Sequence, residues 1–238
     1  MSDSIGLLRY GSESIKYVVL ASPRRKTLGI EVHPDLRVVV RAPANCNPGA
    51  IDLRVRRRAK WIWRQLQHFR RFSPRTPPRH YVGGETHLYL GRQYRLKVVS
   101  DDRNSVKLGG GILVVTIAGK PTPDRVKVLL DAWYRGRARS VFVSVLEQSF
   151  QYFCKRGHEV PRVMVRAMQR RWGSLSPSHV MTLNCNLVRA PKGCIEYVIV
   201  HELCHLVHRH HRPAFYRLLT RLVPDWHRRK ARLEEALL

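Results

Sequence analysis

His201, Glu202 and His205 form a His-Glu-x-x-His sequence, the most chemically informative stretch of the chain. Residues four apart lie on the same face of a helix, so both imidazoles can bind one metal ion. Glu202, next to the first histidine, then lies beside the water molecule that a bound zinc ion activates. This pattern is typical of zinc-dependent hydrolysis, with Glu202 as the catalytic acid/base.

A third protein ligand is expected shortly after this motif. A catalytic zinc site needs three protein ligands and one open position, and the next histidines are His208, His210 and His211. The step from His201 to His211 equals the spacing of the extended metzincin motif, so we predict His211 as the third ligand. Metzincins have glycine where this chain has His208, so the sequence does not predict a metzincin. If His208 or His210 supplied a fourth ligand, the site would be closed and structural.

The residues around the motif favour a helix. Apolar side chains recur at helical spacing from Ile195 to Leu206, as expected for the buried side of a helix. Cys204 lies inside the motif but away from the face of the two histidines, so we expect it to be a small core residue. The alternative is a histidine-rich surface helix that binds metal adventitiously.

The composition indicates a globular protein without disulfide bonds. The chain has 238 residues, of which 44% are hydrophobic, enough for a sizeable core. Its five cysteines are odd in number and form no Cys-x-x-Cys pair, so neither a disulfide framework nor a structural zinc knuckle is indicated. The start has no signal segment, and no apolar run is long enough to span a membrane. We therefore expect a cytoplasmic protein with no membrane span.

The net charge is strongly positive. Lysine and arginine number 44 against 17 acidic residues, a formal charge of +27. Such an excess attracts polyanions, nucleic acid first and anionic membrane surfaces second. A helix expected at about 48–71 alternates aromatic residues with cations, and its residues Arg57, Arg58, Lys60 and Arg64 are candidates for contact with DNA. Two alternatives to nucleic-acid contact stay open. One is that the helix simply has one buried and one solvated face, and the other is that the net charge reflects a generally basic, arginine-rich proteome.

The hydrophobic patterns predict an α+β protein in two parts. A strand-rich region at 1–120 contains the basic helix, and a helical metal-binding part covers 121–238. The first three strands, at 14–20, 27–32 and 36–41, are expected to form an antiparallel meander. A proline-rich stretch at 73–79 is expected to be a loop or linker. The remaining strands are expected around 81–90, 94–99, 112–117, 162–168 and 180–184, and the remaining helices at about 124–155, 195–206, 213–222 and 225–238.

Four motifs in the second half resemble the YgjP-like metallopeptidase family, relatives of the SprT-like proteases. They are Arg-Trp-Gly-Ser-Leu-Ser at 171–176, Leu-Asn at 183–184, Tyr-Val-Ile-Val-His-Glu-Leu-Cys-His at 197–205, and His211 followed by Phe215 and Tyr216. Looser echoes, such as Tyr-Leu-Gly-Arg at 89–92, extend the resemblance over most of the chain. The resemblance implies a zincin-like domain with one zinc site made by His201, His205 and His211, and with Glu202 as the catalytic acid/base. The chain departs from the family pattern at Leu175, where cysteine is usual.

The segment of Trp172, Gly173 and Ser174 is a candidate for substrate binding. In zinc proteases a peptide commonly adds as a strand to an exposed sheet edge above the metal helix. The glycine permits close backbone approach, and Trp172 would line a pocket. Alternatively, Trp172 is a buried residue before a tight turn.

These features predict a zinc-dependent metallopeptidase that hydrolyses peptide bonds. By analogy with the SprT-like proteases, proteins bound to nucleic acid are one class of substrate. The alternative is a nucleic-acid-binding protein whose zinc site is structural or catalytically idle. The number of protein ligands on the metal distinguishes the two.

Overall fold

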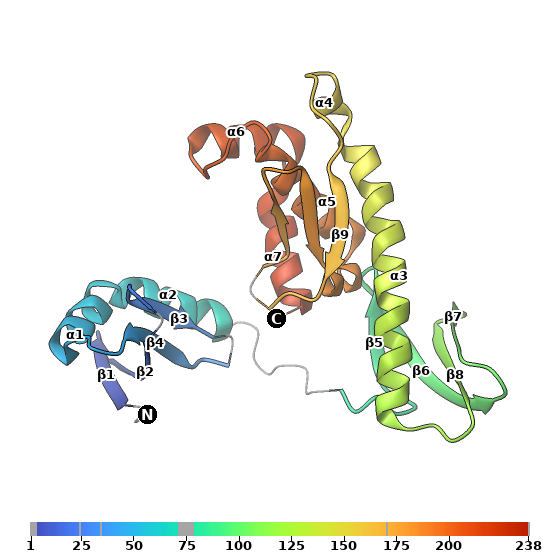
Figure 1. Cartoon of the computed structure of the whole chain (residues 1–238), viewed down its shortest axis with the longest axis horizontal. Coiled ribbons are helices and arrows are strands. Elements are labelled where there is room, and N and C mark those ends of the chain that lie inside the picture. The colour runs from blue at the N-terminus through green and yellow to red at the C-terminus, as the bar shows by residue number, and fades with distance from the viewer. Residues whose placement is uncertain (1–3, 24, 34, 71–78, 170, 238) are drawn as a thin grey trace. The chain divides into compact units, whose positions relative to one another are not determined.

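Figure 1 shows the computed structural model, which describes residues 4–23, 25–33, 35–70, 79–169 and 171–237. The chain divides into two compact units, Met1–Thr76 (unit 1) and Pro77–Leu237 (unit 2). The boundary expected near residue 120 lies inside unit 2, because the strands before it share a buried core with the helix after it. The proline-rich stretch at 73–79 lies outside the described residues except for Arg79.

Unit 1 is a four-stranded sheet with two helices. Its strands are β1 (Ser4–Tyr10), β2 (Glu13–Ser22), β3 (Gly29–Val32) and β4 (Val38–Pro43), in the order β1-β2-β4-β3. The expected meander is wrong, because β2 pairs with β4 in parallel and β3 pairs with the far side of β4. Strand β4 takes an inner position because Val38, Val39 and Val40 are all buried, as is usual for a strand covered on both faces. Strand β1 adds an antiparallel edge that the sequence did not indicate.

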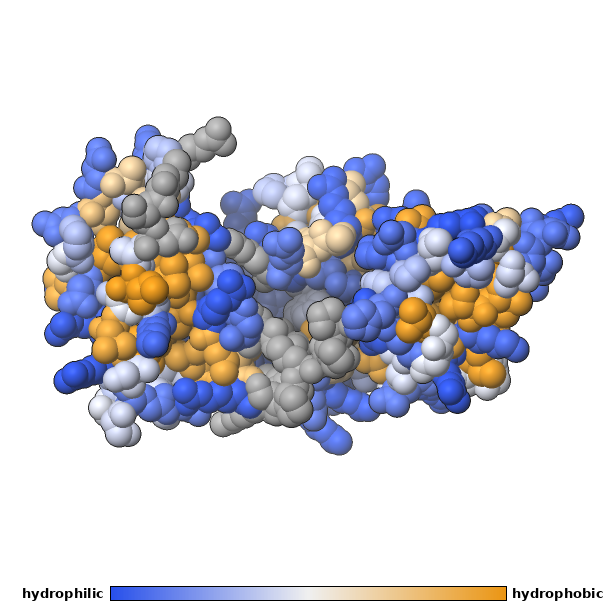
Figure 2. All heavy atoms as spheres, turned by 90° about the horizontal axis from the view of Figure 1, so that it is seen from below, coloured by the Kyte–Doolittle hydropathy of each residue, from blue (hydrophilic) through white to orange (hydrophobic). Residues whose placement is uncertain are grey.

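Helices α1 (Pro48–Arg57) and α2 (Ala59–Arg70) pack on this sheet. The sequence predicts one helix at about 48–71, but the helix is interrupted at Arg58 (φ −103°, ψ 7°), and residue 71 lies outside the described part. The predicted apolar stripe is buried through both helices: Ile51, Val55, Ala59, Ile62 and Leu66. Apolar side chains also gather on one side of unit 1 (Figure 2), and Ile5 and Leu7 of β1 are 75% and 49% exposed.

Unit 2 begins with a second four-stranded sheet packed on a long helix (Figure 1). Its strands are β5 (Thr86–Tyr89), β6 (Arg92–Asp101), β7 (Ser105–Gly109) and β8 (Ile112–Ala118), in the order β5-β6-β8-β7. Helix α3 (Pro123–Ser149) has proline in its first turn and is capped by Thr122, whose side chain accepts a hydrogen bond from the Arg125 N–H. Leu113 and Val115 of β8 are buried in one cluster with Leu130 of α3. This shared core is why unit 2 begins well before residue 120.

The rest of unit 2 contains the candidate site. A three-stranded sheet, in the order β10-β11-β9, joins β9 (Arg162–Arg166), β10 (Gly173–Leu175) and β11 (Val180–Asn184). The other elements are α4 (Gln151–Cys154), the 3₁₀ helix η1 (Cys185–Arg189), α5 (Lys192–Cys204), α6 (Pro213–Leu222) and α7 (Trp226–Leu237). Helix α5 is central, because it contacts α3, α6, α7 and β10. Separate sheets packed with helices confirm the α+β class. Among the described helices, none is long and apolar enough to cross a membrane.

A close backbone contact fixes the start of α5 against the sheet of β5–β8. Gly91 has a left-handed conformation (φ +77°), and a Cβ there would lie 2.6 Å from Cγ of Pro191, the residue before α5. The N–H groups of Leu90 and Gly91 donate to the carbonyls of Val188 and Arg189, at 2.9 Å each. The turn between β5 and β6 therefore holds the beginning of the helix that carries the metal motif.

Candidate metal centre

Three imidazoles meet at the end of helix α5. His201 lies in the last turn of α5. His205 is the first residue after this helix and keeps a helical conformation (φ −70°, ψ −15°), and His211 comes from the loop before α6. Their ligand nitrogens all lie within 4.8 Å of one another, and Nε2 of His201 is 2.9 Å from Nε2 of His211. Nitrogens bound to one tetrahedral zinc ion are separated by about 3.3 Å. The three side chains are therefore placed to hold one ion, and a set of imidazole donors suits zinc.

His208 and His210 stay outside this group, to which the described residues contribute no fourth His, Cys, Asp or Glu. His208 acts through its main chain instead: its carbonyl accepts a hydrogen bond from Nδ1 of His205 at 3.0 Å. This bond orients the His205 ring and leaves Nε2 as its ligand atom. The geometry therefore favours His211 as the third ligand over both alternatives.

A buried phenylalanine packs against all three rings. Phe215 of α6 has no exposed surface, and its ring centre lies 4.9 Å from that of His201, 4.8 Å from that of His205 and 4.6 Å from that of His211. Side chains packed this closely restrict the rotamers of the imidazoles. The sequence showed Phe215 only as part of a motif, since its spacing from His211 does not reveal contacts with the other two histidines.

Glu202 is the carboxyl group of the site, and only 7% of it is exposed. Burial raises the pKa of this group to about 7, although a hydrogen bond from the Leu175 N–H and the charge of Arg171 oppose the rise. A carboxyl group with such a pKa exchanges a proton readily at neutral pH. Burial, together with the neighbouring imidazoles, lowers the pKa of His201 to about 4. His201 is therefore neutral at pH 7, which is the form that binds a metal ion.

Strand β10 lies directly against Glu202. A Cβ on Gly173 would be 2.9 Å from Cγ and 2.9 Å from Oε1 of Glu202, so the absence of a side chain makes room for the carboxylate. The sequence predicted a role for Gly173 in substrate approach and missed this one. Trp172, Gly173 and Ser174 all line the cleft beside the histidines, and Trp172 also packs against the main core. The outer edge of β10 pairs with no other described strand.

A family comparison agrees with this geometry. The model of the YgjP-like metallopeptidase domain matches residues 26–236. The chain belongs to the YgjP-like metallopeptidase family. The match confirms the predicted family and identifies a metallopeptidase in general terms, a class that uses a divalent metal ion, typically zinc. Because the match begins at residue 26, most of unit 1 is part of the YgjP-like domain. A comparison with curated proteins finds no match.

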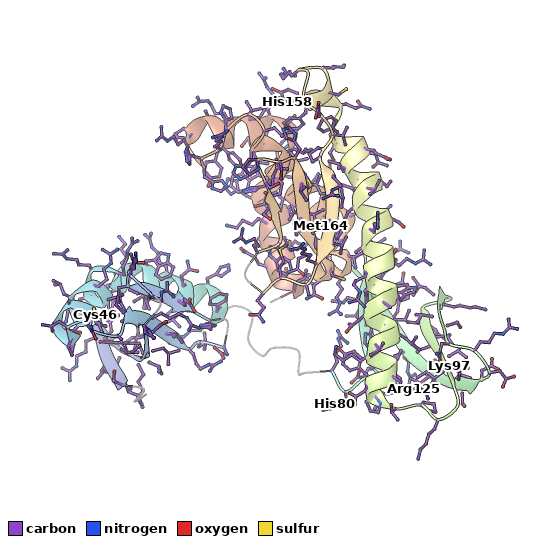
Figure 3. The ribbon with its side chains drawn as sticks, in the orientation of Figure 1. Cys46, His80, Lys97, Arg125, His158 and Met164 are labelled. Atoms are coloured by element: carbon purple, nitrogen blue, oxygen red, sulfur yellow. The ribbon has the colours of Figure 1, made fainter. Side chains whose placement is uncertain are left out.

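The candidate centre of this YgjP-like domain opens into a cleft of about 800 Å³, a size that suits the burial of a ligand. The cations Arg171 and Arg209 and the imidazoles of His158 and His179 line its walls. Figure 3 marks His158 in the loop after α4, so this loop contributes to the cleft from a different part of the chain than α5. Among the described residues that line the cleft, Glu202 is the only acidic one.

The candidate nucleic-acid residues lie in unit 1 of the YgjP-like domain. All four are exposed: Arg57 ends α1, Arg58 lies between the two helices, and Lys60 and Arg64 lie on α2. Within the described ranges, no carboxylate forms an ion pair with any of the four, whereas Arg56 pairs with Asp52 at 2.8 Å. The four residues belong to unit 1, whereas the residues that line the cleft of the metal centre belong to unit 2.

Proposed function

We propose that this protein hydrolyses peptide bonds in protein substrates, with one zinc ion per chain held by His201, His205 and His211 and with Glu202 as the acid/base. The observation that carries the proposal is a buried carboxyl group next to three imidazoles whose ligand atoms lie within 4.8 Å of one another. Bound there, zinc would polarise the scissile carbonyl and lower the pKa of a water molecule toward about 7.

Glu202 is proposed to move the proton. Its carboxyl group has a pKa of about 7, so the carboxylate can accept a proton from the attacking water and return it to the nitrogen of the leaving amine. The Leu175 N–H donates a hydrogen bond to this carboxylate, and the absence of a side chain at Gly173 leaves room for it. The group is therefore oriented before the substrate arrives, which reduces the cost of reaching the transition state.

The open edge of β10 is proposed to bind the peptide. Main-chain groups of Gly173–Leu175 that do not pair with β11, apart from the Leu175 N–H that donates to Glu202, would hydrogen-bond a substrate that adds as a further strand. Trp172 and Ser174 line the adjacent cleft, so we propose them as contacts for substrate side chains.

The variant Glu202→Gln tests the proposal. The amide keeps the shape of the side chain but cannot accept a proton, so zinc content should be unchanged while casein hydrolysis falls by about 10²–10⁴-fold. Both proteins are compared after loading with zinc. Equal hydrolysis by wild type and variant would refute the role of Glu202 and support the alternative, a nucleic-acid-binding protein whose zinc site is structural or idle.

We also propose that the basic helices of unit 1 contact DNA, so that proteins bound to nucleic acid are among the substrates. The supporting observation is that Arg57, Arg58, Lys60 and Arg64 are exposed without a described acidic partner, and that Trp61 among them is 38% exposed. Cations that neutralise phosphates make affinity strongly dependent on salt.

Replacing these four cations by glutamine should reduce the log–log slope of DNA affinity against salt by up to about 3.6, since each phosphate contact contributes about 0.9. Zinc content should not change, because the four residues belong to unit 1 and the three histidines to unit 2. Unaltered DNA affinity and slope in this variant would refute the proposed contact.

A further inference from the structure

The cleft of the metal centre carries two cationic groups. Arg171 and Arg209 line it and are both exposed, and Glu202 is the only acidic side chain among the described residues of its lining. The three histidine ligands are uncharged when they bind a metal ion. The protein therefore supplies two guanidinium groups against one buried carboxyl group, and such a cleft attracts anionic groups.

In the part of the chain that the structure describes, no carboxylate forms an ion pair with Arg171 or Arg209. Arg171 is close enough to Glu202 for its charge to act on that carboxyl group. The main chain of Arg171 is fixed, because its carbonyl accepts a hydrogen bond at 3.2 Å from Nδ2 of the buried Asn184. Arg171 is thus anchored beside the proposed reacting centre with its positive charge available.

Guanidinium groups recognise carboxylates well, because their planar donors match two oxygens at once. We propose that this protein prefers substrates with an aspartate or glutamate beside the scissile bond, and that Arg171 and Arg209 bind the side-chain carboxylate. The inference rests on the proposed peptidase function. The two arginines come from different elements, the segment before β10 and the loop after α5.

Peptide cleavage by the zinc-loaded full chain tests this preference. Matched peptides carry aspartate, asparagine or lysine beside the cleaved bond, and their ends are acetylated and amidated so that only the side chain differs. We expect kcat/KM for the aspartate peptide to exceed that for the asparagine peptide by at least about tenfold, the effect of one charge-assisted hydrogen bond. The lysine peptide should be the poorest substrate, because like charges repel in the cleft.

Variants of the two arginines separate recognition from general damage. Arg171→Gln and Arg209→Gln should each reduce the ratio of aspartate to asparagine cleavage by about three- to tenfold, and Arg209→Glu should favour the lysine peptide. The ratio is the readout because a shift of Glu202 or a loss of zinc lowers cleavage of all peptides alike. The matched control is Arg103→Gln, which removes one positive charge in the turn between β6 and β7 and should leave the ratio unchanged.

Binding of a fluorescent aspartate peptide to the Glu202→Gln protein provides a readout without catalysis. Affinity should exceed that for the asparagine peptide, and Arg171→Gln or Arg209→Gln should each reduce the difference. Equal binding and equal kcat/KM for the two peptides would overturn the acidic preference and leave the peptidase function intact. If the wild type cleaves no peptide, the proposed function fails, and the binding comparison alone decides the preference.

Two further results would overturn the inference. A preference seen only with peptides that have a free C-terminus would mean that the arginines bind the terminal carboxylate. Displacement of the bound aspartate peptide by oligothymidylate, lost in Arg171→Gln, would mean that the cleft binds phosphate groups of nucleic acid instead.

Discussion

Replacing Gly173 by alanine should strongly reduce peptide hydrolysis while leaving the metal in place. The new Cβ would lie 2.9 Å from both Cγ and Oε1 of Glu202, whereas carbon atoms normally stay about 3.5–4.0 Å apart. Glu202 is 7% exposed and accepts a hydrogen bond from the Leu175 N–H, so the contact is relieved only if the carboxylate or β10 moves. Overpacking of this kind costs about 1–3 kcal/mol of stability. A displacement of a catalytic group by about 1 Å costs about 10²-fold in rate, so we expect kcat to fall by that factor.

The assay is peptide hydrolysis by zinc-loaded protein, with zinc content and thermal unfolding measured on the same samples. Gly136→Ala is the matched control, because Gly136 lies in α3, where an added Cβ would meet no described atom within 4 Å apart from the neighbouring helix backbone. This variant should keep full activity and gain about 0.5–1 kcal/mol of stability, since alanine favours the helix. Unchanged kcat in Gly173→Ala would refute the idea that β10 positions Glu202, and loss of zinc would show that β10 supports the metal ligands instead.

Three other predictions concern the metal ligands, pH and the fold. His211→Ala should lose zinc, whereas His208→Ala should keep it, since only the main chain of His208 contacts the site; the reverse pattern in metal analysis would contradict the ligand assignment. Burial lowers the pKa of His87 from 6.5 to about 4, so the unfolded chain binds this proton more readily than the folded protein does. The free energy of unfolding should therefore be at its full value above pH 6.5 and should fall by up to about 3 kcal/mol as the pH decreases toward 4. Chemical unfolding of chelator-treated protein should show a smaller loss over this range in His87→Leu, and identical pH profiles would contradict the burial of His87. Gly91→Ala should cost about 2–4 kcal/mol in chemical unfolding, because the left-handed backbone and the contact with Pro191 both exclude a Cβ; a cost below about 0.5 kcal/mol would contradict that contact.

The part of the metal centre that lies on one helix could be predicted because it depends on local geometry. His201, Glu202 and His205 lie within about one helical turn of each other at the end of α5, so their relative positions follow from the helix itself. His211 was predicted from a motif spacing and from a family resemblance, because the loop that carries it has no regular periodicity. The structure brings this residue to the other two histidines.

Contacts between distant segments could not be predicted from the sequence. The glycine at 173 suggested close backbone approach, but the partner of that approach, Glu202, depends on how β10 packs on α5. The order of strands in unit 1 could not be predicted either, since alternating apolar residues indicate a strand but do not indicate which strand pairs with it. The boundary between the units was misplaced for a similar reason, because the apolar faces of β6 and β8 do not reveal that α3 covers them.

X-ray absorption spectroscopy of the purified, zinc-loaded full chain counts the protein ligands on the metal directly. One zinc ion per chain with three histidine ligands and no fourth protein ligand is expected, because a hydrolytic site needs an open position. The same spectrum of His208→Ala should be unchanged, since the His208 side chain is not part of the cluster of three imidazoles. A fourth histidine or a sulfur ligand would show a closed, structural site and would contradict the proposed peptidase function.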